Sequence, residues 1–192
     1  MPKYNPDIHR RRSIRQKEYD YATIGAYFVT ICTYKRECIF GDILDGKMQS
    51  NEFGHIVEME WLKTPIIRSN IALDGFVVMP NHFHGIMVIN ECRGVLQYAP
   101  TRQHEFRSPS QTIGAIIRGF KSAATKTINE LRDTLGLPVW QRNFFEHIIQ
   151  KEEELYRIRE YINNNPLQWA EDENNPLNIK KMDSASERTY EK

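Results

Sequence analysis

Apolar positions along the chain follow two different spacings, which together predict a mixed fold. Short runs rich in β-branched and aromatic residues, the composition of buried strands, lie at 27–33, 71–79, 82–89 and 139–149. Apolar residues recur at helical spacing after Ser50 or Asn51, which can cap a helix that ends at Pro65. The same spacing predicts a helix capped by Ser110 and reaching 131, and another over 151–164. Residues 91–109 show no period and predict a surface loop.

The order of these elements indicates the fold class. It runs strand, helix, two strands, helix, strand and a last helix, with a small hairpin at 38–49 that turns at Asp45-Gly46. This βαββαβ order predicts a ferredoxin-like α+β fold, an antiparallel sheet with helices packed on one face. RNA-recognition-type (RRM-like) domains share this topology, so the fold alone does not determine the function.

Composition indicates one domain with polar ends. The 192 residues are 40% hydrophobic and 27% charged, which suits a single core. We predict a basic N-terminal arm at 1–20, one folded domain at 21–166 and a polar C-terminal tail at 167–192. The arm carries most of the unbalanced charge. Before residue 18 the only acidic residue is Asp7, whereas the arginines there are Arg10, Arg11, Arg12 and Arg15.

Net charge and cysteine usage predict an ordinary cytoplasmic protein. The formal net charge is only +1, so no overall basic field indicates nucleic acid. The three cysteines have neither zinc-site spacing nor the density of a disulfide scaffold, so we expect reduced thiols. No apolar run is long enough to cross a bilayer, and we expect no membrane partner.

Two histidines interrupt the most apolar part of the chain. Side chains alternate along a strand, so His82 and His84 project from one face while Phe83 packs into the other. Two neutral imidazoles so placed can bind one divalent metal, and we expect them on an open, solvent-facing surface of the sheet. Two half-exposed histidines without a metal are the alternative. Two ligands are too few for a stable site, so a third must come from elsewhere.

The last predicted helix carries the candidates for completing that site. In REYINNNP, Tyr161 and Asn165 are four residues apart and lie on one helical face. Taken alone, Tyr161 is better explained as a residue at the edge of the core. Asn165 precedes Pro166, which disfavours the helical conformation, so its orientation stays open.

Several motifs together resemble a known family. They are YFVTICTYKR (27–36), MPNHFHGI (79–86), GFK (119–121), WQRNFFEH (140–147) and REYINNNP (159–166). In this order they resemble the REP-associated tyrosine transposases, a branch of the single-tyrosine HUH transposases, over about residues 10–170. HUH denotes two histidines around a bulky hydrophobe, here His82, Phe83 and His84.

The resemblance implies the HUH endonuclease fold and a mechanism. His82 and His84 would bind Mg²⁺ or Mn²⁺, with Asn165 as third ligand through its amide oxygen. Tyr161 would attack a DNA phosphate and form a 5′-phosphotyrosine. A single strand or hairpin junction can bring a phosphate to a metal on an open sheet face more easily than a duplex can, so we expect single-stranded or hairpin DNA as the partner of a monomer or homodimer. Basic residues suited to phosphate contacts are Arg10, Arg11, Arg12, Arg15, Lys121 and Arg142.

Other functions fit the same features less well. A histidine-triad hydrolase needs a further histidine where this chain has Ile86. Replication initiators and relaxases use the same metal motif but are usually larger, with the motifs in another order. The main alternative is a domesticated DNA- or RNA-binding domain of this fold without cleavage activity, which would be expected to have lost Tyr161 or a histidine.

Overall fold

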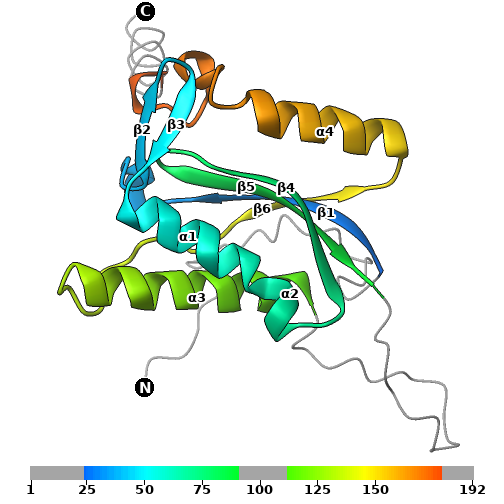
Figure 1. Cartoon of the computed structure of the whole chain (residues 1–192), viewed down its shortest axis with the longest axis horizontal. Coiled ribbons are helices and arrows are strands. Elements are labelled where there is room, and N and C mark those ends of the chain that lie inside the picture. The colour runs from blue at the N-terminus through cyan, green and yellow to red at the C-terminus, as the bar shows by residue number, and fades with distance from the viewer. Residues whose placement is uncertain (1–23, 91–111, 179–192) are drawn as a thin grey trace, which may run out of the picture.

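A four-stranded antiparallel sheet organises the molecule. The computed structural model describes residues 24–90 and 112–178. The sheet has the order β4 (Ile71–Val78), β5 (His82–Ile89), β1 (Gly25–Cys32) and β6 (Phe145–Ile149), and every neighbouring pair is antiparallel (Figure 1). The last strand added in sequence therefore pairs with the first, as in ferredoxin-like domains. The predicted α+β fold class is confirmed.

Helices cover both faces of this sheet. Helices α1 (Glu52–Leu62) and α3 (Ile113–Leu131) pack on one face, and the short α2 (Thr64–Ile67) follows α1. Helix α4 (Glu152–Asn164) lies on the other face, whereas we expected all helices on one face (Figure 1). Its apolar stripe explains this position, because Ile162 packs against Phe28 and Ile86. That pair projects away from α1 and α3.

The strands divide their side chains between two unequal cores. Alternate residues of β1 and β5, such as Val29 and Phe83, join α1 and α3 in the larger core, where Trp61 is fully buried. Ring centroids of Trp61 and Phe83 are 4.7 Å apart. The smaller core beneath α4 leaves part of the opposite face to polar residues. The larger core thus provides a rigid base for that polar face.

Several predicted boundaries shift in the structure. Asn51, one of two predicted caps, begins α1, and its side chain accepts hydrogen bonds from the backbone of Phe53 and Gly54. Thr112 caps α3 instead of Ser110, which lies outside the described residues. The predicted strand 139–149 is regular only at β6. Before it, Trp140 makes an isolated bridge to Thr33.

The small predicted hairpin is present as β2 (Gly41–Leu44) and β3 (Lys47–Ser50). Its turn residues Asp45 and Gly46 have φ of 51° and 70°, the positive values that a two-residue turn of this kind requires. A Cβ on Gly46 would meet the side chain of Leu167, so the hairpin tip lies against the start of the C-terminal segment.

The C-terminal segment differs from the expected polar tail as far as it is described. After α4 a short 3₁₀ helix, η3 (Trp169–Glu171), leads to Asn174 and Asn175, which are only 3% and 5% exposed. Asn81 anchors this segment, because its Nδ2 donates to the backbone carbonyl of Asn174 at 2.7 Å. An amide side chain that has hydrogen-bond partners can be buried. Composition alone did not reveal that this polar segment would be buried.

We predict that Gly85→Ala destabilises the protein by about 1–3 kcal/mol through overpacking. A Cβ at this buried strand position would lie 2.8 Å from side-chain atoms of both Phe83 and Trp61. Gly75→Ala is the matched control, because the nearest atom to its added Cβ is 4.0 Å away. Urea unfolding of both variants measures the difference, and equal midpoints would contradict the close packing around Gly85.

Candidate metal and tyrosine site

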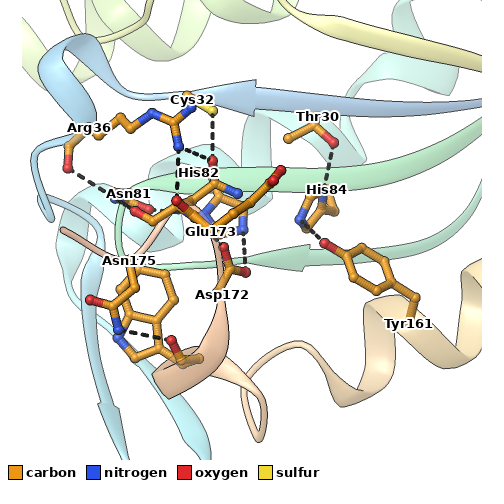
Figure 2. A network of polar contacts seen from close by, with 12 residues as sticks. Thr30, Cys32, Arg36, Asn81, His82, His84, Tyr161, Asp172, Glu173 and Asn175 are labelled. Atoms are coloured by element: carbon orange, nitrogen blue, oxygen red, sulfur yellow. Dashed lines mark hydrogen bonds and ion pairs between the residues drawn. The ribbon is translucent and has the colours of Figure 1, made fainter. Parts of the chain in front are cut away.

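His82 and His84 lie side by side on the face of the sheet that α4 covers. Their ring centroids are 4.6 Å apart, and the residues are 0% and 2% exposed (Figure 2). The predicted shared face is confirmed, but the expected solvent-facing surface is wrong. Residues around Trp169 and Asp172 cover the histidines, and the indole of Trp169 lies 6.0 Å from the His82 ring.

Neighbouring side chains fix the orientation and tautomer of His82. Asn81 donates through its Nδ2 to the carbonyl groups of Arg36 and Asn174, so its Oδ1 remains as the acceptor that faces His82. His82 Nδ1 lies 2.9 Å from that oxygen and must therefore carry the proton. The Nε2 lone pair stays available, and within the described residues this buried nitrogen has no hydrogen-bond partner.

His84 links the strand to the tyrosine of α4. Its Nδ1 lies 2.8 Å from Oγ1 of Thr30, and its Nε2 lies 3.2 Å from the hydroxyl oxygen of Tyr161 (Figure 2). A tautomer protonated on Nδ1 donates to Thr30 and accepts from Tyr161. Phe28 also stacks on the His84 ring, with centroids 5.3 Å apart, so a ring contact holds the imidazole together with the contacts of its two nitrogen atoms.

Two side-chain oxygens face the histidine pair from the C-terminal part of the chain. Asp172 Oδ2 lies 3.7 Å from His82 Nε2, while its Oδ1 accepts from the backbone N–H of Asn174. Asn165 directly follows α4 in helical conformation despite the proline after it, and it is 2% exposed. Among the described residues, no hydrogen bond satisfies its buried Oδ1.

Burial governs the protonation of these groups. It lowers the pKa of His82 to about 4, against an opposing effect of Asp172. Burial, with His82 adding to it, also holds the pKa of His84 well below its ordinary value. Burial and the charge of Asp172 raise the pKa of Tyr161, which the Asn165 amide partly offsets. At neutral pH both imidazoles are therefore neutral, and the phenol keeps its proton.

The donor set fits a divalent metal. Ligand atoms of His82, His84 and Asp172 all lie within 4.8 Å of one another, and the side chain of Asn165 neighbours His82. Two imidazole nitrogens with carboxylate or amide oxygens are ligands that Mn²⁺ accepts well, and the hydrogen bonds on each Nδ1 are those that commonly orient a ligating imidazole. The unpartnered Nε2 of His82 and Oδ1 of Asn165 are two buried atoms that a shared cation would satisfy.

Lys121 and Arg142, the two predicted basic residues that the structure describes, lie away from the histidine pair. Lys121 on α3 donates from Nζ to the backbone carbonyls of Gln141 and Arg142, at 2.6 and 3.1 Å. Lys121 and Arg142 line a cavity of about 880 Å³ between α3 and residues 135–144, on the sheet face away from the histidines. The arm arginines Arg10, Arg11, Arg12 and Arg15 lie outside the described residues.

Comparison with known proteins begins with sequence. No family model matches the chain. An uncharacterized protein from Haemophilus influenzae is 43% identical over 176 residues, covering 89% of this chain and 96% of that protein. The chain belongs to the same family as the Haemophilus influenzae protein.

Comparison with solved structures identifies the fold. The structure of a REP-associated tyrosine transposase bound to a REP hairpin matches with a TM-score of 0.54 at 18% sequence identity. The match covers 81% of this chain and 74% of that chain. The chain has the REP-associated tyrosine transposase fold. The resemblance noted from the motifs is thereby confirmed at the level of the fold. Among the described helices, none is long and apolar enough to span a membrane.

Sequence reasoning missed Asp172 and Asn81. Asp172 lies in the stretch assigned to a polar tail, and nothing around it has a periodic or motif-like pattern. Asn81 offered more signal, because it directly precedes His82 inside the MPNHFHGI motif. An amide beside a histidine on a tight turn can orient that histidine.

We predict that the metal-free protein loses stability as the pH falls from about 6.5 towards about 4. In this window the unfolded chain binds protons on both histidines, whereas the folded chain excludes them by burial. Urea unfolding in the presence of a chelator, at steps between pH 7 and 5, measures the loss above the range where most carboxylates titrate. The His82→Gln/His84→Gln double variant should show a flatter pH profile, and an identical profile would contradict the burial effect.

Proposed function

We propose that this protein is a metal-dependent single-strand DNA nicking and joining enzyme that acts through a covalent tyrosine intermediate. The observation that carries the proposal is the 3.2 Å contact between the Tyr161 hydroxyl and His84 Nε2. It brings a tyrosine from α4 to a pair of neutral, metal-competent imidazoles on β5, with more than seventy residues between them in sequence. A tyrosine at the edge of a core needs no such partner.

The proposed metal ligands are His82, His84 and Asn165, with Asp172 as a further oxygen donor. The unpartnered Nε2 of His82 and Oδ1 of Asn165 support this set, as do the short separations among the ligand atoms of His82, His84 and Asp172. Either Mg²⁺ or Mn²⁺ is compatible, and the two nitrogen donors favour Mn²⁺. When bound, such an ion would polarise a non-bridging oxygen of the scissile phosphate and lower the pKa of a nearby phenol.

Tyr161 is the proposed nucleophile. Its hydroxyl oxygen forms a bond to phosphorus as the bond to the 3′-oxygen breaks, giving a 5′-phosphotyrosine and a free 3′-hydroxyl. The phenol loses one proton and the departing 3′-oxygen gains one. The number of phosphoester bonds is unchanged, so the strand can be joined to another 3′-hydroxyl without ATP.

The proposed substrate is single-stranded or hairpin DNA. Tyr161 is 41% exposed although the histidines beside it are buried, so a phosphate would approach from the tyrosine side. An unpaired strand can bring one phosphate to such a partly covered site more easily than a duplex can. The match to a transposase bound to a REP hairpin supports a hairpin-forming partner. The arm arginines, Lys121 and Arg142 remain proposed phosphate contacts.

We predict that Tyr161→Phe binds hairpin DNA normally and forms no covalent adduct, because only the hydroxyl is lost. Labelled single-stranded hairpins from the DNA flanking the gene, incubated with Mn²⁺, reveal the adduct on a denaturing gel. Tyr156→Phe on the same helix is the control, since its hydroxyl faces Glu152 and should be dispensable. Adduct formation by Tyr161→Phe would exclude Tyr161, and no adduct by the unaltered protein would favour a binding domain without cleavage.

We predict that His82→Ala and His84→Ala abolish Mn²⁺ binding and cleavage, and that Asn165→Ala weakens binding less, since an amide oxygen is the poorer ligand. Asp172→Asn tests the further oxygen donor against Glu173→Gln, which removes the same charge one residue away. Only Asp172→Asn should lower the affinity beyond this general charge effect. Calorimetric titration with Mn²⁺ measures all five variants, and unchanged affinity in both histidine variants would rule out this metal site.

A further inference from the structure

Phe145 is a half-exposed aromatic side chain on the same sheet face as the histidines. It begins the edge strand β6 and is 49% exposed. Its ring packs edge-on against Phe28, with centroids 6.5 Å apart. The exposed phenyl ring leaves a flat apolar surface open to a binding partner beside the histidine pair.

The strand register places Phe145 in one row with the site. Thr30 of β1 pairs with His84 on one side and with Phe145 on the other. Directly paired residues point to the same face, so the three side chains form a line across the sheet. Two strand spacings separate Phe145 from His84, about 10 Å.

Phe28 connects this ring with the reacting groups. Its centroid lies 5.3 Å from that of His84 and 6.1 Å from that of Tyr161, as well as 6.5 Å from that of Phe145. The exposed ring is therefore held by packing on the same residue that supports the proposed nucleophile. A group lying on Phe145 would therefore be separated from anything bound at Tyr161 by about one aromatic ring, that of Phe28.

We propose that Phe145 is a positioning residue that stacks on an unpaired base next to the scissile phosphate. This inference rests on the proposed function and names the form of substrate that the site takes. A phenyl ring stacks on the face of a base and does not read its hydrogen-bonding edge, so any base serves at this nucleotide. A base within a duplex has both faces occupied, and the ring therefore selects an unpaired junction.

The test combines a protein change with a DNA change. Hairpin oligonucleotides carry a single abasic site at each unpaired position in turn, and anisotropy gives affinity while denaturing gels give the adduct rate with Mn²⁺. Phe145→Ala should weaken binding of the intact hairpin about 5- to 150-fold, the range expected for one stacked base. The unaltered protein should lose as much when one particular base is missing. For that oligonucleotide Phe145→Ala should cause no further loss.

Matched variants separate stacking from folding. Phe145→Tyr keeps the flat ring and should restore affinity, and Phe145→Leu keeps apolar volume without the ring and should not. Tyr156→Ala removes another exposed aromatic residue, 57% exposed on α4, and should leave affinity unchanged. Equal thermal melting of the variants confirms that the fold is retained.

The outcomes distinguish this inference from the proposed function. Unchanged affinity in Phe145→Ala would overturn the stacking role even if the adduct forms normally. The same holds if, at every abasic position, the loss of affinity from Phe145→Ala simply adds to the loss from the missing base. If the unaltered protein forms no adduct on any hairpin, the proposed function fails. The affinities of the unaltered protein and of Phe145→Ala for the intact and abasic hairpins then still decide whether the ring stacks on a base.

Discussion

The burial of two imidazoles on a central strand is the constraint around which the site is built. Transfer out of water penalises the charged form, so His82 and His84 stay neutral and each keeps a nitrogen lone pair at neutral pH. A buried imidazole also needs a partner for its N–H, and Asn81 and Thr30 lie beside the Nδ1 atoms. Those contacts turn both Nε2 atoms towards Tyr161, Asp172 and Asn165.

The alternation of side chains along β5 allows stability and chemistry to share one strand. Phe83, between the histidines, packs against Trp61 and Phe120 in the larger core. A register shift of one residue would exchange the two faces and place imidazoles in the apolar core. The tight packing of that core therefore fixes the position of the histidines, although it contributes no ligand.

Long-range contacts bring the remaining groups to this strand. Arg159, two residues before Tyr161, forms an ion pair with Asp74 of β4 through hydrogen bonds of 2.9 and 2.6 Å. This pair holds α4 against β4. The hydrogen bond from Asn81 to the Asn174 carbonyl joins residues 93 positions apart and holds the segment that carries Asp172. The site therefore depends on tertiary contacts of α4 itself and of the segment that follows it.

The sequence by itself determined the fold class and the shared face of the two histidines, because both depend on local periodicity. The period of two along 82–89 placed His82 and His84 on one face, and the order of strands and helices led to the antiparallel sheet. Tyr161 and Asn165 followed from helical spacing together with the motif resemblance. Tertiary structure alone decided that α4 crosses to the face of the histidines and that Asp172 folds back beside them, with the result that the histidines are buried. These features depend on contacts between residues far apart in the chain, and no local pattern of hydrophobic and polar residues encodes such contacts.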